Sequence, residues 1–408
     1  MTYRDGTTAT LGVDDFTALV RLGIPPGYEV SKSVALDGMD YPTWAIQRDH
    51  VDPTTGEIWP SADPGAAIGH RTSTPSHDSK WYCGREINLA CTAAEHGHPL
   101  IAPHLVVGMA IRSGNQDRGP AGSTAVLQAA RHFNTTEVLA DRGYTQLAAT
   151  SFWLPLFEHG IRIVHDLKTQ QRGARSASVP GVIIVDGHPF SAAMPANLRK
   201  LTPPKLSDPA EEQERIRRLY DKRAAYAFTP HSKLDPNTGT QRFKGPARTG
   251  HLRCPNVPAS MRLPRDRPLA ACKKGGACAC GLVITLPLSD DAHLRQRWLY
   301  GTTPWKHEYS RRVAIESVNA EARTHRGHID RGFTRVHGNV RTAILLTFAY
   351  IGLNVRILND WYETRGLTDP WSTRVEDPED DRIRQPLANP DRPTIRDRLT
   401  AGSDPPTN

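Results

Sequence analysis

The stretch HEYSRRVAIESVNAEAR, residues 307–323, predicts more about the fold than any other part of the chain. Each residue of an α-helix turns about 100° around the axis, which places four polar side chains of this stretch within about 60° of one another. These four are Tyr309, Arg312, Glu316 and Arg323. Apolar residues occupy the opposite face and predict a buried side for the helix. They are Ile315, Val318 and Ala322.

One carboxylate between an aromatic ring and two guanidinium groups suits a site that holds a metal ion against a phosphate group. A surface helix with ordinary charge pairs shows the same local pattern, so a single Glu–Arg pair has little weight by itself. Acidic residues elsewhere in the chain have to decide between these two interpretations.

Two aspartates stand at the ends of strand-like runs upstream. The sequence EVLADRGY, residues 137–144, is a short apolar run that ends in Asp141, and Gly143 then permits a tight turn. The sequence SVALDGMD, residues 33–40, offers an earlier run that ends in Asp37. We take Asp37 as the first acidic residue of the site. Asp40, three residues further along the predicted turn, is the alternative.

Together these features resemble the insertion-sequence DDE transposases that carry a Tyr-Arg-Glu-Lys signature. The spacing of Tyr309, Arg312 and Glu316 matches that signature, and Arg323 replaces the usual Lys. The family has a ribonuclease-H-like fold with two catalytic Asp residues after strands, the second commonly in an Asp-Arg-Gly-Tyr sequence, and a catalytic Glu on a late helix. The resemblance covers roughly residues 31–355 and is weak at about 200–300. The catalytic residues that it implies are Asp37, Asp141 and Glu316.

The resemblance implies a DNA transposase that cleaves phosphodiester bonds at transposon ends and transfers the strands to a target. Its three carboxylates are expected to hold two Mg²⁺ or Mn²⁺ ions about 3.5–4 Å apart. Tyr309, Arg312 and Arg323 are expected to contact DNA, because Arg offers a bidentate fork to phosphate. The expected partner is double-stranded DNA, both transposon ends and target, bound by a dimer.

Other runs of the sequence fit an α/β fold with a ribonuclease-H-like mixed sheet, flanked by helices and interrupted by an insertion domain. Strands are predicted at 81–90, 104–111 and 161–167, and helices at 122–132 and 145–159. The predicted organisation is a short N-terminal segment at 1–30, the first part of the catalytic domain at 31–200, an insertion at 201–282, the second part of the catalytic domain at 283–358 and a mobile tail at 359–408.

The composition favours a polyanionic partner. The chain has 51 Lys and Arg against 43 Asp and Glu, for a formal charge of +8. The longest apolar run, residues 342–353, is too short to cross a membrane and predicts a core helix. No charged leader followed by an apolar stretch opens the chain. We therefore expect a cytoplasmic, nucleoid-associated protein without a membrane partner.

Four of the six cysteines fall in the predicted insertion, and four thiolates can close a tetrahedral Zn²⁺ site. The single residue between the last two departs from the usual two-residue spacing, so a structural Zn²⁺ and four free thiols both stay open here. The four are Cys254, Cys272, Cys278 and Cys280.

Two other functions also stay open. Residues 1–30 hold at most one short helix, near 14–22, where relatives usually carry a larger DNA-binding region. This feature favours a truncated, catalytically inactive transposase remnant that still binds DNA. The second alternative is a zinc-stabilised interaction module in which the acidic residues occur in this order by accident.

Overall fold

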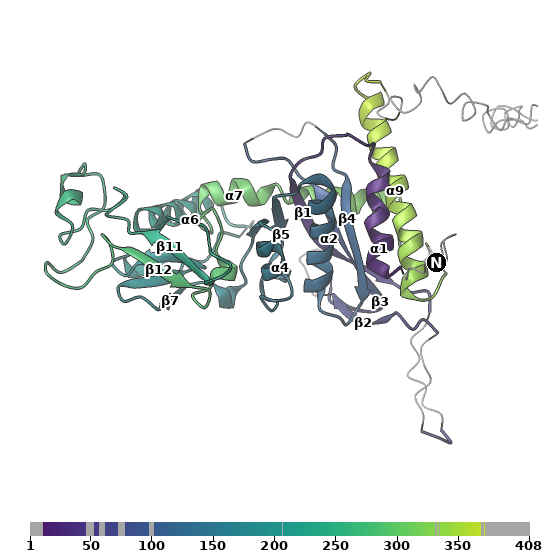
Figure 1. The fold of residues 1–408 in the computed structure, drawn as a ribbon, viewed down its shortest axis with the longest axis horizontal. Helices are drawn as coiled ribbons and strands as arrows, with labels where there is room; N and C mark the ends of the chain where they lie inside the picture. Colours follow the sequence, from purple (N-terminus) through teal and green to yellow (C-terminus); the bar gives the residue numbers. More distant parts are fainter. Residues whose placement is uncertain are drawn as a thin grey trace, which may run out of the picture. The chain divides into compact units, whose positions relative to one another are not determined.

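The computed structural model describes residues 11–45, 53–56, 62–71, 78–97, 102–205, 207–330, 333, 335–368 and 371, and Figure 1 shows its ribbon. The chain divides into a large unit, Met1–Trp361, and a second unit, Tyr362–Asn408. Only residues 362–368 and 371 of the second unit are described, so most of the tail predicted at 359–408 lies outside the described residues.

A mixed sheet at the centre of the large unit confirms the α/β class. Its strands are β1 (Ser33–Pro42), β2 (Ala67–Arg71), β3 (Lys80–Thr92), β4 (Val106–Ser113), β5 (Glu137–Ala140) and β6 (Arg162–His165). β1 lies between β3, which is antiparallel to it, and β5, which is parallel to it. β6 continues in parallel beside β5, while β4 and β2 both pair antiparallel with β3. The order along the main path is therefore β2-β3-β1-β5-β6, and β4 pairs with β3 off this path, which also gives the connected run β4-β3-β1-β5-β6.

Helices cover both faces of this sheet (Figure 1). The helices are α1 (Val13–Thr17), η1 (Ala18–Gly23), α2 (Arg118–Phe133), α8 (Val313–Ala320) and α9 (Asn339–Glu363). Side chains of a strand alternate between the faces, so Leu36 points toward α2 and its neighbour Asp37 toward α8. α9 is held to the edge strand by Asn354, whose side-chain amide bonds both the N–H and the carbonyl of Val106, at 2.9 and 2.7 Å.

A buried ion pair also ties α9 to the sheet. Arg85 of β3 is fully buried, and its two terminal nitrogens donate to the two oxygens of Asp63 at 2.7 and 2.6 Å. The Nε of Arg85 donates to Asn339, the first residue of α9, at 2.8 Å. Asp63 also accepts from the N–H of Gly338 at 2.8 Å.

The helix predicted at 145–159 is wrong. Only α3 (Arg142–Thr145) and α4 (Trp153–Glu158) are helical in this part of the chain. Pro155 lies in the first turn of α4, where its missing N–H is no loss, and this favours a helix that begins shortly before it.

The single helix predicted over residues 307–323 is also wrong, because the chain forms three shorter pieces. α7 (Thr303–Ser310) ends before a tight turn at Arg311 and Arg312, α8 follows, and a π-helical turn, η6 (Glu321–His325), completes the stretch. The N–H of Arg312 donates to the carbonyl of Tyr309 at 3.0 Å, a three-residue bond that tightens the backbone between α7 and α8.

Two further three-stranded antiparallel sheets lie between β6 and α7 (Figure 1). Strands of both sheets share one hydrophobic core. The segment extends beyond 201–282 at both ends, because β7 precedes residue 201 and β12 follows residue 282. Its strands are β7 (Ala174–Ser176), β8 (Val182–Val185), β9 (His188–Ser191), β10 (Thr229–Pro230), β11 (Thr240–Lys244) and β12 (Val283–Pro287). Its helices are η2 (Thr169–Gln171), α5 (Ala196–Arg199), α6 (Ala210–Lys222), η3 (Arg223–Tyr226), η4 (Pro258–Arg262) and η5 (Ala292–Leu294).

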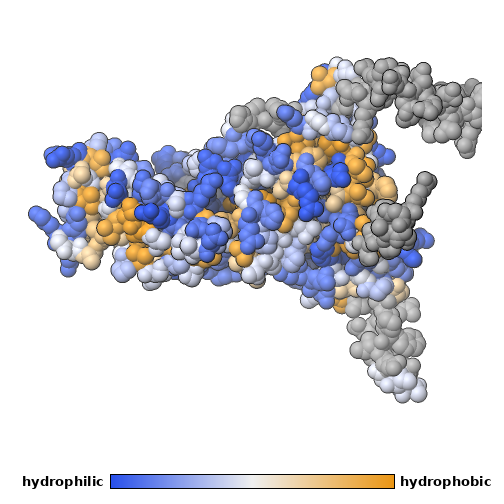
Figure 2. All heavy atoms as spheres, viewed as in Figure 1, coloured by the Kyte–Doolittle hydropathy of each residue, from blue (hydrophilic) through white to orange (hydrophobic). Residues whose placement is uncertain are grey.

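α9 contains the run at 342–353 but has 25 residues, so the prediction that this element is too short to cross a membrane is wrong. In the part of the chain that the structure describes, it is the one helix long and apolar enough to cross a membrane by length and composition. Half of its apolar window is buried among the described residues. Leu345 and Phe348 stay exposed, and Figure 2 shows apolar residues gathered on this side of the chain.

Candidate functional site

Asp37 and Asp141 lie side by side where two parallel strands run next to each other. β1 and β5 pair with Leu36 opposite Ala140, so the next residue of each chain is an aspartate. Neighbouring strands are about 4.8 Å apart, which is close enough for two carboxylates to repel each other. The turn predicted after Asp37 is wrong, because β1 continues to Pro42. β5, by contrast, ends at Ala140, directly before Asp141.

The pKa of Asp37 is raised to about 6, first by burial and then by the negative charge of Asp141. The guanidinium of Arg312 opposes this shift, as does the N–H of Gly38, which donates to Oδ1 at 2.8 Å. A raised carboxyl pKa means that the negative charge is incompletely compensated. A nearby positive charge, such as a bound divalent cation, would compensate this charge.

Arg312 links the predicted site residues to one another. Its guanidinium forms an ion pair with Glu316 at 2.5 Å, and its central carbon lies 5.9 Å from the centre of the Tyr309 ring. Burial alone would lower the pKa of Arg312, but its neighbours outweigh burial and raise it. Those neighbours are Tyr309, Asp37, Glu316 and Asp141. One cation therefore interacts with all three carboxylates that the sequence singled out.

Glu316 and Asn319 of α8 contact different neighbours. The Glu316 side chain is 57% exposed and pairs with Arg312. Asn319, one turn further on, approaches Asp37, with Nδ2 3.5 Å from Oδ2. The Oδ1 of Asn319 is buried and has no hydrogen-bond partner among the described residues. No three carboxylates in the described ranges have oxygens all within 4.8 Å, so a metal site that includes Glu316 requires this side chain to leave Arg312.

Asp40, the alternative first ligand, lies on the other face of β1 from Asp37, because the two are an odd number of residues apart. Its carboxylate pairs with Arg323 at 3.0 Å and with Arg71 at 3.3 Å. Arg323 also donates to the carbonyl of Asp40 at 2.5 Å. Arg323 is therefore bound to β1, apart from the pair that Arg312 forms with Glu316.

The Asp-Arg-Gly-Tyr sequence has a local structural reason. The carboxylate of Asp141 accepts from the N–H of Gly143 at 2.7 Å and caps α3. A Cβ atom on Gly143 would lie 2.8 Å from the Asp141 carboxylate and 2.9 Å from the Arg118 guanidinium, so a larger residue would displace one of these side chains. Tyr144 is buried, and its hydroxyl donates to Asn88 of β3 at 2.6 Å. These contacts fix the direction of the Asp141 side chain.

Sequence reasoning missed three residues that border the carboxylates: Asn319, Arg118 and Glu86. Arg118 pairs with Glu86 at 2.7 Å. Burial would lower the pKa of Arg118, but Glu86 and further anionic groups, Asp141 and Asp37 among them, raise it. The three residues come from α8, α2 and β3, and no local sequence pattern could have shown that these elements meet.

Tyr309 is held in place by stacking. Its ring lies parallel to that of Trp305, with centres 5.0 Å apart and planes 8° apart. The indole N–H of Trp305 donates to Gln296 at 3.1 Å, so the Trp305 ring is also held in place. Burial raises the pKa of Tyr309, which keeps the phenol protonated and able to donate a hydrogen bond.

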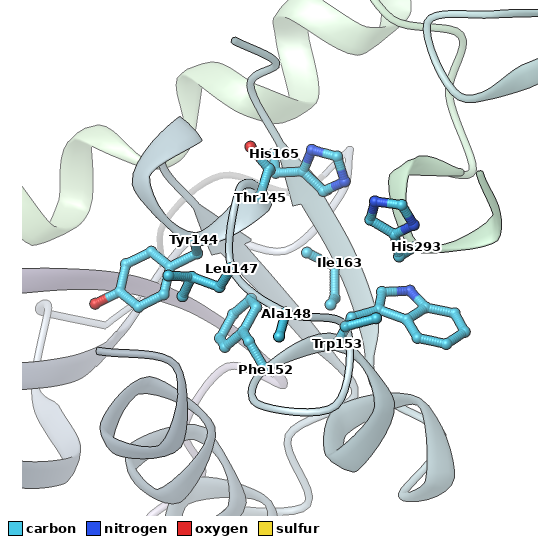
Figure 3. Close-up of a pocket in the computed structure, with 10 residues that line it drawn as sticks. Tyr144, Thr145, Leu147, Ala148, Phe152, Trp153, Ile163, His165 and His293 are labelled. Carbon is cyan, nitrogen blue, oxygen red and sulfur yellow. The ribbon is translucent and has the colours of Figure 1, made fainter. Parts of the chain in front are cut away.

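An enclosed pocket nearby is too small for a nucleotide. Its volume is about 10 Å³, roughly the space of one water molecule. Figure 3 shows that His165 and His293 line it and point toward each other. Burial lowers the pKa of His165 to about 4, so its ring is neutral at neutral pH. This pocket is part of the core, and the candidate site is the carboxylate cluster beyond β1 and β5.

The four cysteines of the insertion form a second candidate site. Their sulfur atoms all lie within 4.8 Å of one another, with Cys254 and Cys278 3.7 Å apart and Cys272 and Cys280 3.8 Å apart. A tetrahedral Zn²⁺ with bonds of about 2.3 Å sets its sulfur ligands about 3.8 Å apart. The cluster therefore fits a metal ion such as Zn²⁺. The irregular spacing is no obstacle, because three separate turns bring the thiols together.

Comparison of the chain with models of protein families, with curated proteins and with solved structures gives no match. The function of both candidate sites has to be argued from their geometry and chemistry.

Proposed function

We propose that this chain is a DDE-type DNA transposase that cleaves strands at transposon ends and transfers them to target DNA with the help of Mg²⁺ or Mn²⁺. The observation that carries the proposal is the position of Arg312, whose guanidinium interacts with Asp37, Asp141 and Glu316 together. Glu316 pairs with Arg312 directly, and the negative charges of Asp37 and Asp141 help to raise the Arg312 pKa, so three carboxylates from distant parts of the chain act on one cation. Metal-assisted phosphoryl transfer would need these carboxylates to converge on bound ions.

The sheet supports a ribonuclease-H-like fold for the catalytic part. The order β4-β3-β1-β5-β6, with β3 antiparallel to β1 and β5 and β6 parallel to it, is the strand arrangement expected of that fold. In chain order, β1 is the first of these five strands and contains Asp37, and β5 is the fourth and is followed directly by Asp141. Glu316 follows on a later helix that packs on β1 and β3.

Asp37 and Asp141 are the residues that would hold the metal, and Glu316 or Asn319 of α8 would complete the ligand set. The bound ions would polarise the phosphate and lower the pKa of the attacking water. Arg312 neutralises the carboxylates in the absence of metal and can turn to a DNA phosphate when metal replaces it. Tyr309, fixed on Trp305, offers its hydroxyl as a donor to the DNA backbone. We propose that the protein binds duplex DNA as a dimer in the nucleoid.

A second candidate function, an inactive remnant that binds DNA, is favoured by the exposure of Glu316 and its pairing with Arg312. A cleavage assay on the DNA that flanks the gene, with Mg²⁺ or Mn²⁺, separates the two. Cleavage by the parent protein and none by Asp141→Asn supports the transposase. Equal cleavage by both proteins excludes the three-carboxylate mechanism. Binding without cleavage under any divalent ion supports the remnant.

A further inference from the structure

The positive charge of the chain is concentrated in the segment from residue 231 to 282. This basic segment has ten Lys and Arg residues and two acidic residues, for a formal charge of +8, and the whole chain also has a formal charge of +8. All other residues therefore sum to zero. The ten cations are Lys233, Arg242, Lys244, Arg248, Arg253, Arg262, Arg265, Arg267, Lys273 and Lys274.

The cations of the basic segment have no acidic partners. All ten lie in described ranges, and no salt bridge found there includes any of them, whereas the arginines around the carboxylate site are paired. Eight of the ten are exposed; Lys244 and Arg253 are partly buried. Exposed cations without acidic partners attract polyanions.

One group of these cations is fixed by a strand. Arg242 and Lys244 are two residues apart on β11 and share a face, while Phe243 between them is buried in the core. The N–H of His231 donates to the carbonyl of Arg242 at 2.8 Å. Positive charge lowers the pKa of His231, with Lys244 contributing most and Arg242 adding to it. A rigid sheet therefore presents a compact positive group.

A second group lies on the loop between two of the clustered cysteines. Lys273 and Lys274 follow Cys272 directly, and both are exposed. Asn256 shapes this loop: its side chain donates to the carbonyls of Lys273 and Gly276, both at 3.0 Å, and accepts from the N–H of Gly275 at 2.7 Å. The next cysteine, Cys278, closes the loop, so a metal ion bound by the cysteines holds both of its ends.

We propose that the basic segment is a nucleic-acid-binding surface that contacts the phosphate backbone of duplex DNA, and that a Zn²⁺ ion on the four cysteines sets the Lys273–Lys274 loop for this contact. The proposal rests on the proposed function only for the choice of duplex DNA as the partner. The basic segment, which would bind the phosphate backbone of DNA, contains none of the three proposed catalytic carboxylates.

The test measures binding of the full-length, zinc-loaded protein to a duplex of mixed sequence, by fluorescence anisotropy over a range of salt concentrations. The variants are Lys273→Gln with Lys274→Gln, and Arg242→Gln with Lys244→Gln. The control is Arg215→Gln with Arg218→Gln, which removes two exposed cations of α6 that are already paired with Glu212 and Glu214.

Each variant of the basic segment should bind at least tenfold more weakly at 0.1 M salt. Each should also reduce the slope of log K against log salt by about 2, because two phosphate contacts are lost. The control should bind like the parent. Unchanged affinity of both segment variants overturns the proposal, and so does an equal loss in the control. An acidic polypeptide or anionic vesicles that compete as well as DNA at equal charge overturn the choice of nucleic acid.

The metal is tested with Cys272→Ser and by removing Zn²⁺ from the parent, with metal content and circular dichroism measured on the same samples. Either treatment should weaken DNA binding as much as the double Lys substitution, and it should weaken the double Lys variant no further. Full affinity without the metal overturns the role of Zn²⁺. Cleavage by Asp141→Asn would reject the proposed mechanism while leaving this surface intact, so the two proposals fail separately.

Discussion

Replacing Asp37 by Asn is expected to stabilise the metal-free protein above pH 6. The pKa of Asp37 rises from 3.8 to about 6 on folding, so the folded state holds this proton more tightly than the unfolded chain does. The free energy of unfolding therefore falls as pH rises through this interval, and above pH 6 the folded protein carries the full penalty of an ionised Asp37. Asn has nearly the same shape and carries no charge.

The two pKa values set the size of the effect. About two units at 1.36 kcal/mol each give a gain for Asp37→Asn of up to about 3 kcal/mol at pH 8. At pH 4.5 the same relation leaves about 1 kcal/mol, because most of the Asp37 carboxyl is then protonated in the folded state. The difference between the two proteins should therefore shrink as the pH is lowered, whatever other groups contribute to both.

The measurement is urea unfolding of the parent and of Asp37→Asn at pH 4.5 and pH 8, in buffer without Mg²⁺. Asp40→Asn is the matched control, because it removes a carboxylate from the same strand but breaks ion pairs with Arg71 and Arg323. It should leave stability unchanged or lower it. Added Mg²⁺ should stabilise the parent at pH 8 and have no effect on Asp37→Asn. A loss of stability in Asp37→Asn at pH 8 would refute the charge argument.

Four further substitutions test the neighbouring residues. Asp141→Asn should abolish cleavage and leave DNA binding equal or slightly stronger, since the site becomes less negative; a cleavage assay and a gel shift measure both. Arg312→Ala should weaken DNA binding at every sequence and lower the salt slope by about 1; an unchanged slope would exclude a phosphate contact. Arg323→Lys should cleave within a few-fold of the parent, because an ammonium can still reach Asp40. Arg85→Met should lower the free energy of unfolding by about 3–5 kcal/mol, because it leaves Asp63 buried without its partner; a cost below about 1 kcal/mol would show that the pair is not needed.

Local sequence patterns were sufficient for the elements that build the sheet. The strands at 33–37, 104–111 and 137–140 were predicted from short apolar runs that end at Gly or polar residues, and all are present. The helix at 122–132 and the apolar helix that contains 342–353 follow from periodicity in the same way. Such patterns record which side chains share one face of a strand or helix, and that is set by the local period of the element.

The details of the site could not be predicted in that way. Helix geometry placed Tyr309 and Arg323 on one face, but the tight turn at Arg312 and the π-helical turn after α8 change the angle per residue. Arg323 consequently reaches Asp40. The choice between Asp37 and Asp40 depends on how β1 pairs with β5, which is a contact between residues far apart in the sequence.

The distribution of charge suggests that DNA binding and DNA cleavage are separable in this chain. Outside the basic segment the formal charges sum to zero, and the arginines near the carboxylates, such as Arg312 and Arg118, are already paired. Without metal, these paired arginines are held by the neighbouring carboxylates and are not available to a polyanion. Divalent ions at Asp37 and Asp141 would release Arg312 toward a phosphate, so metal binding and DNA engagement should strengthen each other at this site. The basic segment needs no Mg²⁺ for its contacts and can hold DNA before that step occurs.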